Sequence, residues 1–381
     1  MRIGIIGTRG IPNHYSGFEQ CAEFLSVALV EKGHQVTVYN SHNHLHQEKT
    51  FKGVDIIHCY DPEYRIGTFG QFIYDLNCIL DSRKRNFDII LQLGYNSNSI
   101  WNKLLPHNSV IITNMDGLEW KRTKFSPRVQ RFLQQAESWA AHTSDYLVSD
   151  SRGIQQYLKE KYNKDSTYIP YGSYVFDEPD TDILQEYGLV PYTYNMLVAR
   201  LEPENSIELI LDGVVASKDN TQFLVVGKNH TKYGQYLAEK YKAQSNIRFM
   251  GGIYNLKKLN NVRYFSNLYF HGHTVGGTNP SLLEAMGSDC LICAHNNAFN
   301  KAILGSDAFY FNEPLDVAKE LETLSKKQYG GYVDTNRDKV RDIYHWPLIV
   351  DQYESLFISS LENSKVAQLE EALSLSPTKV G

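Results

Sequence analysis

The sequence of 381 residues lacks the features that mark nucleic-acid-binding, membrane-spanning and exported proteins. It has no basic excess, since 38 Lys and Arg residues stand against 43 Asp and Glu residues, and this balance argues against a nucleic-acid partner. It has no run of about twenty apolar residues, the length that a membrane span needs. Its first ten residues, MRIGIIGTRG, lack the apolar stretch of a signal peptide. We therefore expect a cytoplasmic protein that binds no nucleic acid.

Cysteine is scarce, and the usual metal-binding patterns are missing. Five scattered cysteines, an odd number, form no disulfide framework and fit a reducing compartment. No Asp-x-Asp pattern stands in a loop suited to a metal, because Asp180 and Asp182 fall in an expected linker. His42, His44 and His46 alternate without cysteines or a carboxylate cluster beside them, which favours a polar loop over a metal site. We expect no metal and no bound cofactor.

The dinucleotide-binding fingerprint G-x-G-x-x-G is also absent from the first loop, GTRGIPNHYSGFE. Its glycines at positions 7, 10 and 17 do not have the required spacing, so NAD binding loses its main support. A loop of this length between a strand pattern and a helix pattern still favours ligand binding, because loops at strand ends usually hold the ligand.

Short apolar runs alternate with helical patterns along most of the chain. Residues 3–6 form an apolar run, a helical pattern follows at 18–32 and stops at Gly33, and QVTVYN is the next strand pattern. Alternation of this kind predicts a parallel sheet with helices on both faces. Because 381 residues exceed what one core usually serves, we predict an α/β protein with two doubly wound domains.

A polar, proline-containing stretch begins around residues 169–173, and we place the linker between the domains there. The first predicted domain is residues 1–172, and the second is residues 173–344. A C-terminal helix at about residues 345–365 is expected to pack back on the first domain. Two such domains favour ligand binding at the carboxyl ends of the strands.

The segment VGGTNPSLLEAM, residues 275–286, follows an apolar strand pattern and opens a helix. Its two glycines allow close backbone approach to a ligand, and Pro280 suits the first turn of a helix. The N–H groups of residues 278–283 and the helix dipole then form an anion site that fits a diphosphate. Glu284, one turn further in, is well placed to accept two hydrogen bonds from a ribose diol. The alternative is an ordinary helix-capping segment with a partly exposed glutamate.

Arg200 stands in VARLEPENS, again where a strand pattern ends. A guanidinium at this place binds phosphate oxygens bidentately and stabilises the charge that builds on a leaving diphosphate. The alternative is a surface arginine paired with Glu202 or Glu204. Asp116 and Glu119, in NMDGLEWKRTK, also follow a strand pattern and are candidates to meet a substrate hydroxyl, although acids in a loop are usually only solvated.

Together these segments resemble glycosyltransferase family 4. VARLEPENSIELIL is similar to the arginine loop of that family, and HGHTVGGTNPSLLEAM is similar to its donor-binding glutamate loop. GTRGIP, YSGFE, NMDGLEWKR and IPYG are similar to a bacterial subgroup that includes rhamnosyltransferases of surface polysaccharide biosynthesis. The resemblance runs from residue 1 to about 360. It implies the GT-B architecture, two Rossmann-like domains facing a central cleft, and transfer with retention of anomeric configuration.

The resemblance also implies roles for individual residues. Arg200, Asp116 and Glu119 would act at the reacting groups, Arg200 on the diphosphate and the two acids toward the acceptor. The implied donor-binding residues are Gly17, Lys228, Ile253, Tyr254, His273, Gly276, Gly277, Thr278, Asn279, Pro280, Ser281, Leu282 and Glu284. The implied acceptor-side loop comprises Arg9, Gly10, Tyr15, Ser16 and Glu19.

Three positions depart from the family's pattern. Asn205 stands where many relatives carry a lysine as a second cation on the diphosphate, and Lys228 is our candidate replacement, with a solvated lysine as the alternative. Gly276 stands where the first of two glutamates is common, which leaves open how the sugar hydroxyls are recognised. Ser16 precedes Gly17 where the subgroup usually has two glycines.

We therefore expect a retaining, metal-independent hexosyltransferase that takes a sugar from a nucleoside diphosphate donor. The first choice of donor is rhamnose on deoxythymidine diphosphate, and the first choice of acceptor is a lipid-linked saccharide at the inner face of the membrane. A UDP-sugar or GDP-sugar donor is an alternative. Two competing hypotheses are a nucleotide-sugar epimerase of the same fold, which needs no acceptor, and a non-enzymatic sugar-binding protein.

Overall fold

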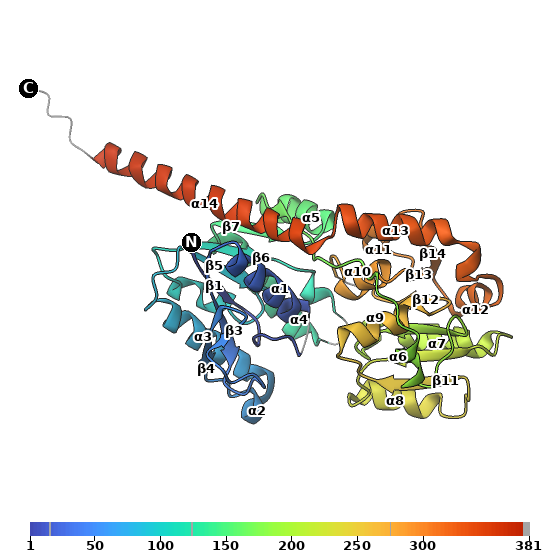
Figure 1. The fold of residues 1–381 in the computed structure, drawn as a ribbon. Helices are drawn as coiled ribbons and strands as arrows, with labels where there is room; N and C mark the ends of the chain where they lie inside the picture. The colour runs from blue at the N-terminus through green and yellow to red at the C-terminus, as the bar shows by residue number, and fades with distance from the viewer. Residues whose placement is uncertain (15–16, 123–124, 275, 376–381) are drawn as a thin grey trace, which may run out of the picture. The chain divides into compact units, whose positions relative to one another are not determined.

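The computed structural model describes residues 1–14, 17–122, 125–274 and 276–375, with side chains up to residue 366. These residues form two compact units (Figure 1). The first unit combines residues 1–117, 131–170 and the chain from Trp346 onward, and the second combines residues 118–130 and 171–345. The boundary between the units lies after Pro170, and the predicted boundary lies after residue 172. Residues 118–130 are a correction, because we assigned them to the first domain and they group with the second unit.

The described part of the first unit contains an eight-stranded sheet in the order β3-β4-β2-β1-β5-β6-β7-β8. The neighbouring strands run parallel, except for the antiparallel pair β3 and β4. The strands are β1 (Arg2–Ile6), β2 (Gln35–Ser41), β3 (Thr50–Phe51), β4 (Val54–Cys59), β5 (Ile89–Leu93), β6 (Val110–Asn114), β7 (Tyr146–Ser149) and β8 (Thr167–Tyr168).

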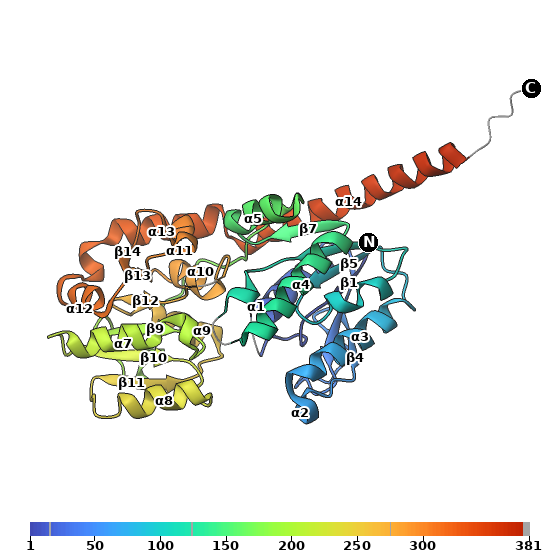
Figure 2. The same cartoon turned by 180° about the vertical axis from the view of Figure 1, so that it is seen from behind.

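Helices cover both faces of this sheet (Figures 1 and 2). They are α1 (Gly17–Glu31), α2 (Glu63–Ile66), α3 (Gly70–Ser82), α4 (Pro127–Thr143), α5 (Arg152–Tyr162) and α14 (Trp346–Leu375), with the short 3-10 turns η1 (Gly67–Phe69), η2 (Ser99–Leu104) and η3 (Glu119–Lys121). Ile6 packs with Tyr74 and Ile79 of α3 in one apolar cluster. Because side chains alternate along a strand, Ile3 and Ile5 point to the opposite face. α1 contacts β2 and α14, so the C-terminal helix packs on the first unit.

The described part of the second unit contains a six-stranded, all-parallel sheet in the order β11-β10-β9-β12-β13-β14. Its strands are β9 (Tyr194–Val198), β10 (Gln222–Val226), β11 (Ile247–Gly251), β12 (Tyr269–His271), β13 (Ile292–His295) and β14 (Phe309–Phe311). Its helices are α6 (Asp182–Gln185), α7 (Ile207–Ala216), α8 (Lys232–Lys240), α9 (Leu256–Tyr264), α10 (Pro280–Gly287), α11 (Ala298–Leu304), α12 (Pro314–Thr323) and α13 (Gly330–Asp342), with η4 (Pro203–Asn205) and η5 (Lys326–Gln328). Residues of its strands and of α7, α8 and α12 share one apolar core.

Each sheet has a point where the order of the strands reverses. In the first unit this switch point lies between β1 and β5, and in the second it lies between β9 and β12. Ligands of open α/β sheets bind beyond the carboxyl ends of the strands at such points. The loops that follow β1, β9 and β12 are therefore the places to search for a site.

The C-terminal helix α14 ends at residue 375, ten residues beyond the predicted end at 365. Within the described residues, no helix is both long and apolar enough to cross a membrane.

Candidate functional site

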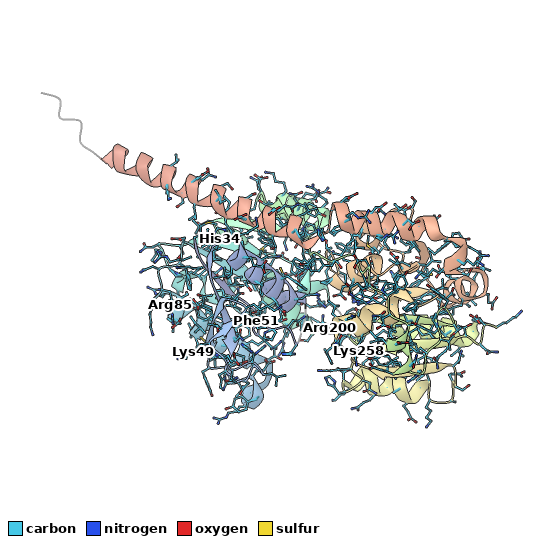
Figure 3. The ribbon with its side chains drawn as sticks, in the orientation of Figure 1. His34, Lys49, Phe51, Arg85, Arg200 and Lys258 are labelled. Atoms are coloured by element: carbon cyan, nitrogen blue, oxygen red, sulfur yellow. The ribbon has the colours of Figure 1, made fainter. Side chains whose placement is uncertain are left out.

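Arg200 lies two residues beyond β9, at the switch point of the second unit, and its side chain is exposed (Figure 3). Within the described part of the chain, no carboxylate forms an ion pair with it. Glu204, one of its two alternative partners, lies 3.5 Å from Arg122 instead. The guanidinium of Arg200 is therefore available to an anionic ligand, and the structure does not support the alternative of a paired surface arginine.

The loop that carries Arg200 is held by its own side chains and by the loop after β12. Asn205 donates from its side-chain amide to the carbonyl of Arg200 at 2.7 Å. Thr274, beyond β12, donates from its N–H and its hydroxyl to the carbonyl of Glu204 at 3.1 and 2.8 Å. A Cβ atom at Gly272 would lie 2.2 Å from the carbonyl oxygen of Asn205, so only glycine permits this approach. The two loops that flank the switch point therefore form one hydrogen-bonded assembly.

Lys228 provides a second cation at the same edge of the sheet. It follows β10, its side chain is exposed, and its Nζ lies 4.8 Å from the ring centroid of Tyr254, which follows β11. Tyr254 is 62% exposed, and Ile253 beside it is half-buried. Because β11, β10 and β9 are parallel neighbours, Tyr254, Lys228 and Arg200 follow one another along the carboxyl edge. Two cations and an exposed aromatic ring suit a ligand that has both phosphate and ring groups.

The loop before α10 leaves fewer N–H groups open than we expected. The side-chain Oδ1 of Asn279 accepts from the N–H of Ser281 at 2.9 Å, and its carbonyl accepts from the N–H groups of Leu282 and Leu283. The first turn of α10 is thus capped from within, which corrects the prediction that all amides of residues 278–283 face a ligand. The dipole of α10 still favours an anion before Pro280. Thr278 is buried, and Gly277 is half-buried.

Gly276 has a φ of +139° and open space where a side chain would start. A glutamate in this conformation would be strained, which agrees with the lack of a sugar-reading glutamate at this position. The neighbouring residue 275 lies outside the described residues. The backbone conformation therefore gives a reason why this chain has Gly276 where relatives commonly have a glutamate.

Glu284 lies in α10 with its side chain 14% exposed, and its Oε2 is 2.6 Å from Nη2 of Arg263. Arg263, on α9, is only 1% exposed and also donates from Nη2 to the hydroxyl of Ser281 at 3.3 Å. Nothing in the local sequence LKKLNNVRY marks this arginine as buried, because a single basic residue in a helix is usually solvated. Arg263 is thus a residue of the site that the sequence did not reveal.

His271 and His273 form a stacked pair at the end of β12, with ring centroids 4.4 Å apart and ring planes at 13°. Burial, and to a lesser extent the positive charge of Arg263, lower the pKa of His271 to about 3. Burial also lowers the pKa of His273, and His271, Arg200 and Arg122 add to this effect. Both rings are therefore neutral at pH 7. The positive charges of Arg200 and Arg122 disfavour protonation of His273.

Glu119 and Arg122 belong to the segment that groups with the second unit. Nε of Arg122 donates to Oε1 of Glu119 at 2.6 Å, and Arg122 also approaches Glu204. The carboxylate of Glu119 is therefore engaged by a cation of the second unit, and its contact with an acceptor stays a prediction. Asp116 belongs to the first unit, has a left-handed φ of +46°, and donates from its N–H to the side chain of Asn114. Arg122 is the second residue that the sequence did not single out.

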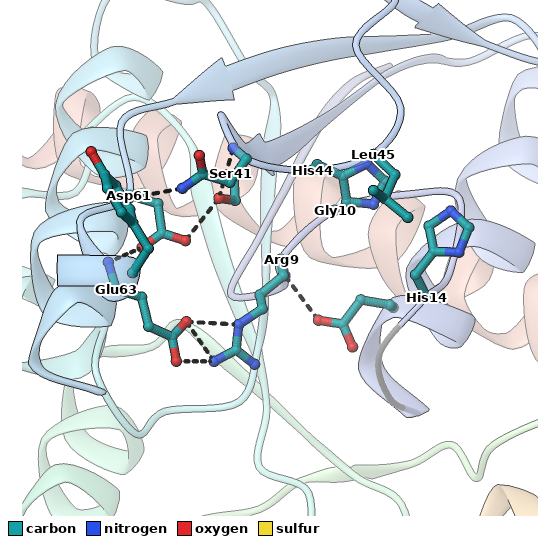
Figure 4. A pocket seen from close by; sticks show the side chains of 11 residues that line it. Arg9, Gly10, His14, Ser41, His44, Leu45, Asp61 and Glu63 are labelled. Carbon is teal, nitrogen blue, oxygen red and sulfur yellow. Dashed lines mark hydrogen bonds and ion pairs between the residues drawn. The ribbon is translucent and has the colours of Figure 1, made fainter. Parts of the chain in front are cut away.

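A pocket of about 330 Å³ lies in the first unit beyond the carboxyl ends of β1, β2 and β4, on one side of the switch point (Figure 4). Arg9, beyond β1, forms three hydrogen bonds with the carboxylate of Glu63, from Nε at 3.0 Å and from Nη2 at 2.7 and 2.8 Å. The N–H of Arg9 donates to the buried carboxylate of Glu19 at 2.8 Å. Next to Glu63, the hydroxyl of Ser41 donates to Asp61 at 2.8 Å. Charged and hydroxyl groups from four separate segments thus meet in one pocket.

Two glycines of the loop after β1, Gly10 and Gly17, were predicted as site residues, and the structure describes their backbone. Gly10 has a φ of +118°, and a Cβ there would lie 2.2 Å from Cγ of Asn40, so a side chain is excluded. Gly17 is the first residue of α1. Tyr15 and Ser16 lie outside the described residues, and their roles stay predictions. Among the residues that the structure describes, no group of three or more His, Cys, Asp or Glu side chains is arranged to hold a metal.

Asp61 and Glu63 complete the pocket and were not singled out from the sequence. Both follow β4, and a carboxylate just beyond a strand is a signal that could have found them. Aliphatic and aromatic side chains also stand near this pocket with large exposed fractions, namely Leu45 at 79%, Tyr60 at 48%, Tyr64 at 59%, Ile66 at 47% and Phe69 at 65%. Leu45 and Tyr64 line the pocket itself.

Two doubly wound units of this kind make up the GT-B fold, and comparison with solved structures agrees. Sucrose-phosphate synthase from Thermosynechococcus elongatus has a TM-score of 0.76 at 15% identity, over 94% of this chain and 98% of that one. HepE from Anabaena, in complex with UDP and glucose, has a TM-score of 0.73 at 13% identity, over 94% and 99%. WaaG, a glycosyltransferase involved in lipopolysaccharide biosynthesis, has a TM-score of 0.68 at 13% identity, over 92% and 99%. At these identities the likeness shows the fold.

Comparison with sequence families and with curated proteins gives no information on the activity. Residues 1–174 match a family described as a domain of unknown function, DUF1972. No curated protein matches the sequence. The activity must therefore be argued from the residues of the two switch points.

Proposed function

We propose that the protein is a retaining glycosyltransferase that moves a sugar from a nucleoside diphosphate to a saccharide acceptor. The observation that carries the proposal is the set of side chains at the switch point of the second unit. The exposed cations Arg200 and Lys228 end two neighbouring strands, and Glu284 lies in the helix that follows a third. Cations suit a diphosphate, and a fixed carboxylate suits ribose hydroxyls. The GT-B fold supports the proposal, because its solved examples include glycosyltransferases.

The chemistry that we propose is front-face attack, in which the leaving phosphate oxygen takes the proton of the acceptor hydroxyl. The bond from the anomeric carbon to the diphosphate breaks, and the bond to the acceptor oxygen forms on the same face. Such a reaction needs no strong base, only orientation of two substrates and stabilisation of the diphosphate charge. Arg200 and Lys228 are the candidates for this stabilisation, together with the dipole of α10. We propose that the reaction requires no metal ion.

The donor that we propose first is rhamnose on deoxythymidine diphosphate. The resemblance of GTRGIP and NMDGLEWKR to a bacterial subgroup that includes rhamnosyltransferases supports this choice. The comparator is UDP-glucose, because HepE from Anabaena is described in complex with UDP-glucose. Tyr254 and Ile253 are the candidates to border the base, since they follow β11 beside Lys228.

We propose that the pocket of the first unit receives a lipid-linked saccharide. Asp61, Glu63 and Ser41 offer hydrogen-bonding groups of the kind that sugar hydroxyls need. Exposed apolar side chains such as Leu45 and Phe69 suit a lipid or a membrane surface, which supports a cytoplasmic protein in peripheral contact with the inner face of the membrane. Sedimentation with anionic vesicles tests this part. Leu45→Ser and Phe69→Ser together should lower binding, whereas Leu315→Ser, an equally exposed leucine of the second unit, should not.

The main experiment incubates the full-length protein with dTDP-rhamnose, UDP-glucose or GDP-mannose and a polyprenyl-diphosphate-linked monosaccharide. We expect release of one nucleoside diphosphate together with a glycolipid that is one sugar larger, detected by mass spectrometry. The anomeric configuration of the product, read by NMR, should match that of the donor. An epimer formed from the donor alone, or no turnover with any donor, would contradict the proposal.

A further inference from the structure

A buried arginine stands behind the carboxylate that we assign to the ribose. Arg263 lies on α9, is 1% exposed, and places Nη2 2.6 Å from Oε2 of Glu284 on α10. A charge removed from water in this way costs several kcal/mol unless a partner of opposite charge accompanies it. Arg263 is therefore out of reach of a ligand but in direct contact with a residue of the proposed donor site.

The guanidinium of Arg263 also binds the first turn of the donor helix. Nη2 donates to the hydroxyl of Ser281 at 3.3 Å, and Nη1 donates to the side chain of Asn260 at 3.0 Å. The hydroxyl of Ser281 is in turn 2.9 Å from the hydroxyl of Tyr269 on β12. One planar group thus connects α9, α10 and the switch-point strand β12, and its geometry fixes where Glu284 stands.

The buried charge of Arg263 is compensated mainly by its contact with Glu284. Burial alone lowers the pKa of Arg263, but the carboxylate of Glu284 and the phenol of Tyr269 raise it, and the net shift is upward. Among the described residues, Glu284 is the only carboxylate that forms an ion pair with Arg263. The side chain of Glu284 is 14% exposed, so this contact does not bury it completely.

We infer that Arg263 is the positioning residue of the donor site, holding the carboxylate of Glu284 oriented so that it accepts hydrogen bonds from the hydroxyls of the nucleoside, two in a ribose and the 3′-hydroxyl alone in a deoxyribose. The inference rests on the proposed function. It separates the roles of two residues, since Glu284 touches the nucleoside and Arg263 acts only through Glu284. A purely structural role for Arg263 would lower stability but would leave recognition of the ribose hydroxyls unchanged.

The test compares nucleotides that differ only in the ribose hydroxyls. Dissociation constants of the full-length protein are measured by calorimetry for UDP and 2′,3′-dideoxy-UDP, and for dTDP, whose deoxyribose carries only the 3′-hydroxyl, and 3′-deoxy-dTDP. The ratio of the two constants in each pair reports recognition of the hydroxyls. The variants are Arg263→Met, Arg263→Lys and Glu284→Gln. The control is Arg248→Met, a half-buried arginine of β11 that donates to the carbonyl of Tyr187.

For the wild type we expect a ratio of about 10 or more in the pair that binds, since hydrogen bonds to a charged group are worth about 1.5–3 kcal/mol. Arg263→Met and Glu284→Gln should lower the ratio to within about threefold of unity, and Arg263→Lys should give an intermediate value because lysine lacks the planar fork. Arg248→Met should keep the wild-type ratio. Melting temperatures are recorded in parallel. If Arg263→Met does not fold, the ratio of dissociation constants measured for Arg263→Lys tests the inference.

Two results would overturn the inference, and they are distinguishable. If the wild type binds none of the nucleotides, both the proposed function and the inference fail. If the wild type discriminates between the nucleotides and the Arg263 variants that fold discriminate equally well, the inference alone fails, and Arg263 is only structural.

Discussion

Asn205 donates from its side-chain amide to the backbone carbonyl of Arg200 at 2.7 Å, and it is itself only 5% exposed. The resemblance to family 4 implies a lysine at this position in many relatives, as a second cation on the diphosphate. In this chain the side chain of Asn205 stabilises the arginine loop from inside, and the second exposed cation at this edge of the sheet, beside Arg200, is Lys228. Asn205 thus lacks the positive charge of a lysine, but its hydrogen bond holds the backbone of Arg200, which keeps its own charge.

Asn205→Ala should therefore weaken donor binding through the position of Arg200. Loss of one buried hydrogen bond costs about 1 kcal/mol of folding stability, and the freed loop should raise the KM for the donor at least severalfold. Steady-state kinetics and thermal melting measure the two effects. Asn229→Ala, at an exposed asparagine near Lys228, is the matched control. An unchanged KM in Asn205→Ala would contradict this role.

Two glycines of the second unit should not tolerate a methyl group. A Cβ at Gly227 would lie 2.1 Å from the carbonyl oxygen of Ala199, and one at Gly272 would lie 2.2 Å from that of Asn205. Because backbone atoms cannot move aside cheaply, Gly227→Ala and Gly272→Ala should each lower the free energy of unfolding by about 1–3 kcal/mol. Urea denaturation followed by circular dichroism measures this. Gly331→Ala, where no atom lies within 4 Å, should be neutral or slightly stabilising, and an equal loss there would contradict the argument.

Asp75 on α3 should make the stability of the protein depend on pH. Burial raises its pKa to about 7, and a hydrogen bond from the hydroxyl of Ser97 opposes this in part. The usual value is near 4, so between pH 4 and 7 the folded state holds a proton that the unfolded state has lost. The contribution of Asp75 to stability therefore falls as pH rises through this range.

Asp75→Asn removes this titration. The stability of the variant relative to the wild type should increase by about 2 kcal/mol between pH 5 and pH 8, measured by urea denaturation at each pH. Asp55→Asn, at an exposed aspartate of β4, should give a difference that does not change with pH. A pH-independent difference for Asp75→Asn would show that the carboxyl is already ionised at pH 5.

Chelation should leave the activity intact. If Arg200 and Lys228 stabilise the leaving diphosphate, a divalent cation is not needed for that task. Initial rates in EDTA should agree with the untreated rate within about twofold, and added Mg²⁺ should not raise them. A rate that falls more than about tenfold in EDTA and recovers with Mg²⁺ would contradict the metal-independent mechanism.

Much of the fold could be predicted because short strands and helices alternate visibly in the sequence. The apolar run before Gly7 and the helical pattern after Gly17 suffice to predict a doubly wound unit, and the same pattern recurs after the linker. The extent of α14 and the grouping of residues 118–130 were not predicted. Both depend on tertiary contacts, which a local pattern does not contain.

The sequence could suggest candidate residues where they follow strand patterns. Arg200 and Lys228 were proposed because loops at strand ends hold ligands, and Glu284 because it lies in the helix after such a loop; their roles stay predictions. Arg263 was not found, since it acts through Glu284, which is distant in sequence. Arg122 was not found either, because its contact with Glu204 depends on the fold, although its other partner, Glu119, is close in sequence. A buried arginine cannot be told from a solvated one until the packing around it is known.

The most direct test of the account is the turnover of Arg200→Ala in sugar transfer. Arg341→Ala, an exposed arginine of α13 paired with Asp338, is the matched control. We predict that Arg200→Ala lowers kcat by roughly 100- to 1,000-fold, as loss of one donor to a developing negative charge does in other enzymes, and that the control stays within about twofold of the wild type. Turnover of Arg200→Ala equal to that of the wild type would contradict the central claim.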